Sequence, residues 1–160
     1  MIILKKRTRK TYTNEILHYD VIDGDTIHCT LDLGYNIYHK TTVRLRGIDT
    51  PELKGNLLEK LAANRVKDLL DVIISKSLNE RYIDLDSYEK NPTDGYGRVI
   101  GDIYIASADK NLTYLLITYG VARPYKKEEG RKPWTDQDLN LVIKKCDEAS
   151  EKLAEGKWQW

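Results

Sequence analysis

The sequence predicts an α+β domain, mainly β, in which a five-stranded antiparallel barrel carries three α-helices. Two observations support this fold class. In the first half of the chain, apolar and polar residues alternate in short runs separated by turn residues, which is typical of half-buried strands joined by hairpins. Over residues 57–76, and again after residue 111, the apolar residues recur every three and four positions, which indicates amphipathic helices.

The strands are predicted first. They are expected over residues 16–22, 27–33, 37–46, 82–87 and 99–105. Gly34, Tyr35 and Asn36 supply a hairpin turn between the second and third strands, and residues 91–95 give a dense turn signal before the fifth. Five short strands with a helix inserted after the third suit a small closed barrel of the OB type.

Three helices complete the fold. The first is predicted over 57–76 from its apolar periodicity. Asn111 is expected to cap a short second helix, which Gly120 ends. Thr135, with Asp138 three residues later, resembles a capping box at the start of the third helix.

Composition limits the class of protein. The 160 residues carry 26 Lys plus Arg against 25 Asp plus Glu, a net charge of +1. This charge excludes a protein that binds nucleic acid through a uniformly basic surface, but it does not exclude a local basic groove. We expect a basic arm over residues 1–15 and a single domain over 16–160.

Cys29 and Cys146 have no zinc-site spacing and are predicted to be reduced core thiols. No apolar stretch is long enough for an export signal or a membrane span, so we expect a cytoplasmic protein.

Two carboxylate-rich segments stand at predicted strand ends. The first holds Asp25 in the run DGDT, and the second holds Asp49, Thr50 and Glu52 in the run DTPE. Hard divalent cations prefer oxygen ligands, so Asp25, Asp49 and the Thr50 carbonyl could hold a metal ion. Glu52 would remain to activate or orient a water molecule.

Two arginines accompany these carboxylates. Arg44 precedes Asp49 by five residues on the polar side of its strand, and Arg98 follows the turn at 95–97. Phosphodiester cleavage passes through a highly charged phosphorus species. Guanidinium groups suit that charge because they bind it bidentately and stay protonated.

The conjunction of these motifs in order resembles the staphylococcal nuclease (thermonuclease) family. The resemblance is carried by residues 21–26 (VIDGDT), 43–52 (VRLRGIDTPE), 96–98 (YGR) and 115–122, and it covers about residues 16–158. It implies an OB-type barrel with three helices. It also implies Ca²⁺-dependent hydrolysis of DNA and RNA with little sequence preference. The loop 126–134 departs from the family pattern.

The resemblance assigns roles by position. Asp25 and Asp49 correspond to calcium-ligating aspartates, and Thr50 to the residue that lends its carbonyl. Glu52 corresponds to the glutamate that activates water, and Asp23 to an acidic position behind the metal ligands.

The remaining positions concern the substrate. Arg44 and Arg98 correspond to the two phosphate-binding arginines. Tyr96 corresponds to a tyrosine that holds the nucleotide, and Tyr125 to a second such tyrosine at a looser spacing.

Three functions remain open on the sequence. The first is an active monomeric nuclease with DNA or RNA as its substrate. It would need Ca²⁺ but no small-molecule cofactor, and it would not bind a membrane. It could be phage-encoded or released on lysis. The second is a catalytically silent nuclease-like module that binds nucleic acid or a protein partner. Two metal-type carboxylates would repel a polyanion, which favours the nuclease. The third, a sugar hydrolase, explains neither the arginines nor their spacing.

Overall fold

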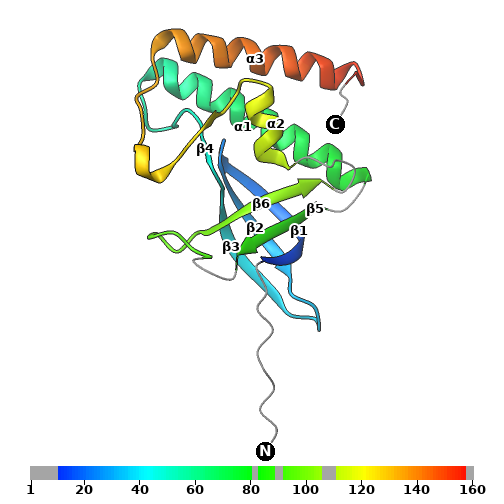
Figure 1. The fold of residues 1–160 in the computed structure, drawn as a ribbon. Helices are drawn as coiled ribbons and strands as arrows, with labels where there is room; N and C mark the ends of the chain where they lie inside the picture. The colour runs from blue at the N-terminus through cyan, green and yellow to red at the C-terminus, as the bar shows by residue number, and fades with distance from the viewer. Residues whose placement is uncertain (1–10, 81–82, 89–91, 106–110, 158–160) are drawn as a thin grey trace, which may run out of the picture.

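The computed structural model describes residues 11–80, 83–88, 92–105 and 111–157, in which helices α1 and α3 lie side by side across one end of a closed barrel (Figure 1). The barrel strands follow the order β1, β2, β3, β6, β5, and a small separate sheet joins β4 to β7. In chain order the elements are β1 (Thr11–Asp23), β2 (Thr26–Asp32), β3 (Tyr38–Leu45), β4 (Ile48–Asp49), α1 (Leu57–Glu80), β5 (Ile83–Tyr88), β6 (Val99–Ile105), α2 (Leu112–Thr118), β7 (Arg123–Pro124), the 3₁₀ helix η1 (Lys127–Glu129) and α3 (Asp136–Ala154).

The α+β class, the closed five-stranded barrel and the three α-helices agree with the sequence prediction. The strands, however, are not antiparallel throughout, because β3 and β6 pair in parallel, with Val43 opposite Val99 and Leu45 opposite Gly101. The other neighbouring pairs of the barrel are antiparallel. The reason is arithmetic: five is odd, so strands that alternate in direction around a closed ring must leave one parallel pair. The insertion of α1 after β3 supplies the long crossover that this pair needs.

Strand β1 begins earlier than expected. Its first part pairs with β5, with Tyr12 opposite Ser87 and Glu15 opposite Asp84. Residues 12 and 13 are exposed, so this part of the strand lacks the apolar alternation that marks a half-buried one. Residues 11–15 therefore belong to the barrel, and the rest of the expected basic arm lies outside the described residues.

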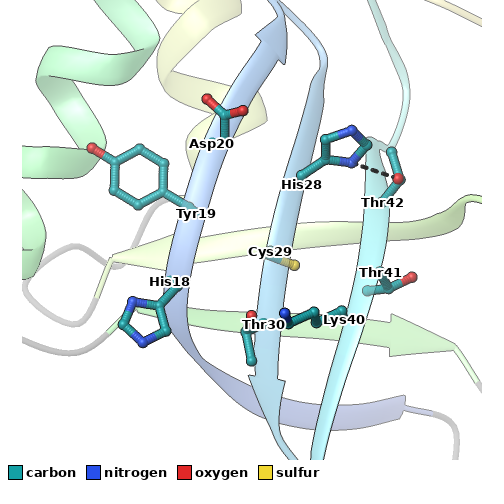
Figure 2. A pocket seen from close by; sticks show the side chains of 9 residues that line it. All are labelled: His18, Tyr19, Asp20, His28, Cys29, Thr30, Lys40, Thr41 and Thr42. Atoms are coloured by element: carbon teal, nitrogen blue, oxygen red, sulfur yellow. Dashed lines mark hydrogen bonds between the residues drawn. The ribbon is translucent and has the colours of Figure 1, made fainter.

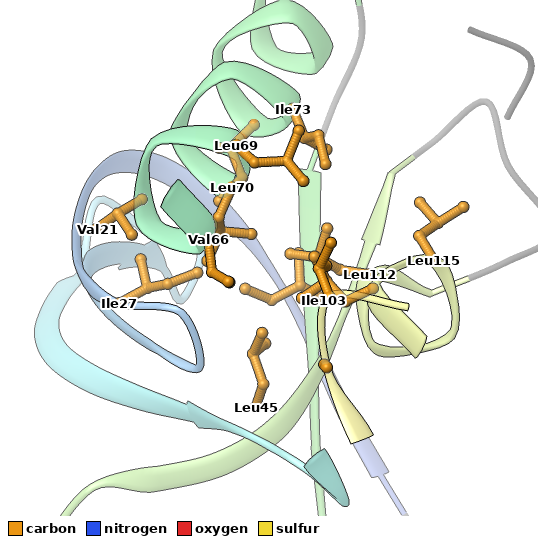
Figure 3. Packing of buried hydrophobic residues seen from close by; sticks show 14 of the residues in the cluster. Val21, Ile27, Leu45, Val66, Leu69, Leu70, Ile73, Ile103, Leu112 and Leu115 are labelled. Atoms are coloured by element: carbon orange, nitrogen blue, oxygen red, sulfur yellow. The ribbon is translucent and has the colours of Figure 1, made fainter. Parts of the chain in front are cut away.

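The core fills the barrel and continues onto α1 and α2 (Figure 3). The apolar period of α1 places Val66, Leu69, Leu70 and Ile73 on its buried face, as predicted. The largest fully buried side chains are those of Ile27, Leu45, Ile48, Leu69, Leu70, Ile73, Ile74, Ile83, Leu85, Ile103, Ile105 and Leu112.

The predicted ends of α2 and the predicted start of α3 are confirmed, whereas α1 continues to Glu80, beyond its predicted end at residue 76. The Asn111 side chain accepts a hydrogen bond from the Tyr114 N–H at the start of α2. Thr135 and Asp138 form a reciprocal capping box at the start of α3. Gly120 follows α2 with φ 72°, a conformation that favours glycine. Across the described segments, no helix has the length and apolar character to cross a membrane.

Candidate active site

The two carboxylate-rich segments meet at one rim of the barrel. The Thr50 hydroxyl, just after β4, donates a hydrogen bond of 3.2 Å to Asp25 Oδ2, just before β2. Asp25 is 8% exposed and Asp49 is 3% exposed. We refer to Asp25, Asp49, Thr50 and Glu52 together as the carboxylate rim.

Gly24 allows the two carboxylate-rich segments to pack this closely. The turn between β1 and β2 is closed by the Asp23 carboxylate, which accepts the Gly24 N–H at 2.8 Å. A Cβ atom at position 24 would lie 2.6 Å from Val66 Cγ1 and 2.8 Å from Thr50 Oγ1. Only glycine therefore lets the turn pack against both α1 and the segment after β4.

Asp23 is the acidic neighbour of this turn. Burial raises the pKa of its carboxyl to about 6, against the lowering effect of the Gly24 hydrogen bond. The charge of Asp25 adds to the rise, whereas the Arg44 and Arg131 guanidinium groups oppose it. Asp23 therefore carries only a partial negative charge in mildly acidic solution.

Arg44 connects the two halves of the rim. It lies opposite Thr26 in the pairing of β2 with β3, and its Nη2 is 3.1 Å from Asp25 Oδ2. The same guanidinium donates 2.8 Å hydrogen bonds to the carbonyls of Leu45 and Ile48. The sequence predicted Arg44 beside the carboxylates, and these contacts place it there.

Asp49 is surrounded by two further arginines. Pairing of β4 with β7 sets Arg123 opposite Asp49, and Arg123 donates to Asp49 Oδ2 through Nε at 3.0 Å and Nη2 at 2.8 Å. Arg131 lies 2.9 Å from Asp49 Oδ1 through its Nε. The buried carboxylate thus has a cationic partner on each oxygen, as a buried charge requires.

Arg131 also contacts the rest of the rim. Its Nη2 donates to the Thr50 carbonyl at 3.0 Å, and its Nη1 pairs with Glu52 Oε1. The Glu52 side chain is about half exposed, and its backbone N–H donates to Glu59 at the start of α1. Glu52 is therefore held at the open side of the rim.

Arg98 and Tyr96 lie in a separate turn between β5 and β6. Arg98 Nε donates to Asp94 Oδ2 at 2.6 Å, and the N–H groups of Tyr96 and Arg98 donate to Asp94 Oδ1. The Tyr96 side chain is 88% exposed, and its ring centroid is 5.5 Å from the Arg98 guanidinium carbon. Among the contacts of the described residues, none joins Arg98 to the carboxylate rim.

Tyr125 follows β7 directly. Its N–H donates to the Gly47 carbonyl at 2.9 Å, which places its backbone beside the turn that leads into β4. Tyr125 therefore lies on the same side of the barrel as Asp49, whereas Tyr96 extends into solvent from the other turn.

The donor set of the rim fits a hard cation. Its carboxylate and carbonyl groups are all oxygen ligands of the kind that Ca²⁺ prefers. Asp49 and the Thr50 carbonyl already converge on one positive group, the Arg131 guanidinium. Within the described ranges there is no group of three or more His, Cys, Asp or Glu side chains that could hold a metal. A calcium ion held by Asp25, Asp49 and Thr50 would therefore also need water ligands.

A hollow of about 420 Å³ lies elsewhere, on the outer face of β1, β2 and β3 (Figure 2). It holds His18, Asp20, His28 and Lys40, and the His28 ring nitrogen is 2.7 Å from the Thr42 hydroxyl. It offers one carboxylate and no arginine. Among the described residues, the carboxylate rim brings more oxygens into contact with guanidinium groups than this hollow does, so the rim is the stronger candidate site.

Sequence reasoning missed Arg123, Arg131 and Asp94. Arg123 was one of many cations, and only the long-range pairing of β4 with β7 brings it to Asp49. Arg131 belongs to a loop with several neighbouring cations, none distinguished by a motif. The departure of this loop from the family pattern was the one available signal.

Comparison with known proteins identifies a family for this chain. A family model for staphylococcal nuclease homologues matches residues 42–158. The match includes Arg44, Asp49, Glu52 and Arg98, whereas Asp25 precedes it. No curated protein matches the chain significantly. Since the family model covers well over half of the chain and the fold is the expected barrel with three helices, the protein belongs to the family of staphylococcal nuclease homologues.

Proposed function

We propose that this protein is a calcium-dependent nuclease that hydrolyses phosphodiester bonds of DNA and RNA with low sequence specificity. Membership of a nuclease-like family supports the general class. One observation carries the specific proposal: two buried carboxylates, Asp25 and Asp49, lie at the same rim as the Thr50 carbonyl, with the Arg44 guanidinium against Asp25.

The proposed metal site uses Asp25, Asp49 and the Thr50 carbonyl. A bound calcium ion would supply positive charge against the phosphate oxygens. Glu52, at the open side of the rim, accepts a proton from the attacking water. The water oxygen then bonds to phosphorus, the P–O ester bond breaks, and the leaving oxygen takes up a proton from solvent.

Arg44 binds the phosphate in this proposal. Its Nη1 and Nη2 groups are oriented by backbone carbonyls and by Asp25, so the guanidinium needs little reorganisation to meet the growing negative charge. Arg98 would join it from the turn at 94–98, where Asp94 orients its Nε and the side chain is 31% exposed. Tyr96 and Tyr125 would contact the nucleotide.

A binding module without activity is the alternative. The concentration of carboxylates speaks against it, because Asp25, Asp49 and Glu52 would repel a nucleic acid unless a cation stood between them. The hollow on β1, β2 and β3 has too little net positive charge to compensate, since Lys40 is balanced by Asp20.

A cleavage assay tests the proposal. Single- and double-stranded DNA and RNA are incubated with the protein in Ca²⁺, Mg²⁺ or EDTA, and the products are separated on gels. We expect cleavage in Ca²⁺, little in Mg²⁺, which demands a tighter octahedral site, and none in EDTA.

Asp25→Asn is the informative variant, with Asp20→Asn as its matched control on an exposed face of β1. We expect Asp25→Asn to abolish cleavage and Asp20→Asn to retain it. Thermal unfolding of both variants checks that they are folded. Full activity in folded Asp25→Asn would exclude the carboxylate rim as the metal site.

A further inference from the structure

A single side chain, Arg131, contacts three of the four groups of the carboxylate rim. Its guanidinium is 2.9 Å from Asp49 Oδ1, donates to the Thr50 carbonyl at 3.0 Å, and pairs with Glu52 Oε1. Two of these groups belong to the proposed metal site, and the third is the proposed proton acceptor. A positive group thus lies at the oxygens where a metal ion would bind.

The surroundings of Arg131 allow its side chain to move away from the carboxylate rim. The Asp49 side chain is 4% exposed, but that of Arg131 is 36% exposed, so the guanidinium covers the buried carboxylate from the solvent side. Arg131 is not part of the hydrophobic core, so its side chain can turn toward water without disturbing that core.

The chain after Arg131 is held in place independently. Arg123 donates to the carbonyls of Lys132 and Pro133, and its guanidinium carbon lies 3.8 Å from the Trp134 ring centroid. Arg123 also keeps its own two hydrogen bonds to Asp49 Oδ2. If the Arg131 contacts were lost, Arg123 would therefore still neutralise part of the charge of Asp49 and would still hold residues 132–134 in place.

We propose that Arg131 is an internal counter-cation that competes with the metal ion for Asp49 and Thr50, and so sets the metal affinity of the site. This inference rests on the proposed function. A guanidinium and a calcium ion repel each other and cannot occupy the same oxygens, so metal binding must displace Arg131. Arg131 is thus a positioning residue: it keeps the buried oxygens satisfied and lowers the apparent affinity for calcium.

Calorimetric titration tests the competition. Protein stripped with EDTA and dialysed is titrated with CaCl₂ for the wild type, Arg131→Gln and Lys127→Gln. Lys127 is an exposed cation of the same loop, so its variant controls for general charge. We expect Arg131→Gln to bind calcium about ten-fold more tightly, the scale of one lost charge interaction at a partly exposed site, and Lys127→Gln to differ little from the wild type.

Arg131→Lys adds a graded test. A lysine retains the charge, but its compact ammonium group lacks the planar fork with which the guanidinium reaches Asp49, Thr50 and Glu52, so the calcium affinity of Arg131→Lys should fall between those of the wild type and Arg131→Gln. Thermal unfolding provides a second readout. In EDTA, Arg131→Gln should melt below the wild type, because Asp49 and Glu52 lose a partner. In excess calcium that difference should disappear.

The outcomes separate this inference from the proposed function. Unchanged or weaker calcium binding by Arg131→Gln, beside calcium-dependent cleavage by the wild type, overturns the competition and leaves the nuclease standing. Tighter binding by Arg131→Gln, with no cleavage by the wild type, supports the competition and overturns the nuclease. Absence of calcium binding by every variant overturns both.

Discussion

At the scale of single residues, buried carboxylates and arginines determine the chemistry of the rim. Asp25 is paired with Arg44, and Asp49 with Arg123 and Arg131. The sequence identified both members of the first pair as candidate site residues, because both belong to motifs, although it did not predict their contact. It could not predict the second, because the partners of Asp49 come from residues more than 70 positions away and follow no local pattern.

Glu52 should be essential for turnover and dispensable for metal binding. Replacing Glu52 by Gln removes a proton acceptor, and general-base catalysis contributes about 10²- to 10⁴-fold to rates. We therefore expect kcat to fall by about that factor. Calcium affinity should not weaken, because Glu52 is not among the proposed ligands and its loss removes one contact of Arg131.

Steady-state kinetics and calcium titration check this prediction, with Glu128→Gln, an exposed carboxylate of η1, as the control. A wild-type kcat in Glu52→Gln would remove Glu52 from the mechanism. A large loss of calcium affinity would instead make it a metal ligand.

At the scale of the elements, the strands form the barrel and the turns between them position the candidate site residues. The hairpin turn at 34–36 was predicted from its residues, and Gly34, Tyr35 and Asn36 all have positive φ. The parallel pair β3–β6 was not predicted, because strand direction around a ring depends on all five strands together and not on any one run of residues.

The turn at Gly24 should tolerate no side chain. In Gly24→Ala the new Cβ would overlap Val66 and Thr50, and overpacking of this kind costs about 1–3 kcal/mol of unfolding free energy. Because Thr50 must move, calcium binding should weaken as well. Gly95→Ala is the matched control, since no described residue other than its chain neighbours has an atom within 4 Å of its Cβ position. Urea denaturation and calcium titration measure both effects, and equal stability of the two variants would contradict the close packing of Gly24 against Val66 and Thr50.

The turn at 94–98 should lose stability in acid. Burial alone would raise the pKa of Asp94, but the hydrogen bonds from the Arg98 side chain and from the Arg98 and Tyr96 N–H groups outweigh it and lower the pKa below its ordinary 3.8. Ionised Asp94 therefore stabilises the fold at neutral pH. That contribution is fully present above the pKa of Asp94 in the unfolded chain. It is lost as the pH falls from there through the lower pKa of the folded state.

Asp94→Asn tests this pH dependence. At pH 7 the variant should be less stable than the wild type by about 1 kcal/mol, the net contribution of a charged hydrogen bond at a partly exposed site. Urea denaturation should show the difference shrinking as the solution is acidified through the pKa of the carboxyl. A difference that stays constant over this range would mean that the charge of Asp94 contributes nothing.

At the scale of the whole molecule, one core holds the barrel, α1 and α3 together. Periodicity predicted this core well, because it reports which side of each element is buried. Cys29 and Cys146 belong to it and are free thiols, as predicted. Burial raises the pKa of the Cys29 thiol to about 11 and that of Cys146 to about 12.

Both thiols should therefore react only when the molecule opens. The thiolate is the reactive form, and almost none is present at neutral pH in the folded protein. We expect labelling by an aromatic disulfide reagent to be slow in native buffer and to accelerate with urea in parallel with global unfolding. Rapid labelling of either thiol in native buffer would show local opening of the core.

The most direct test of the central claim is the initial rate of nucleic-acid cleavage over a buffered calcium series, starting from EDTA. Two carboxylates and one carbonyl would be a sparse ligand set for calcium, and Arg131 already contacts part of that set. We therefore expect no cleavage in EDTA and half-maximal activity near 10⁻⁴ to 10⁻³ M free calcium, about the range of weak calcium sites. Cleavage that persists in EDTA, or that is half-maximal at submicromolar calcium, would contradict a weak calcium site at the carboxylate rim.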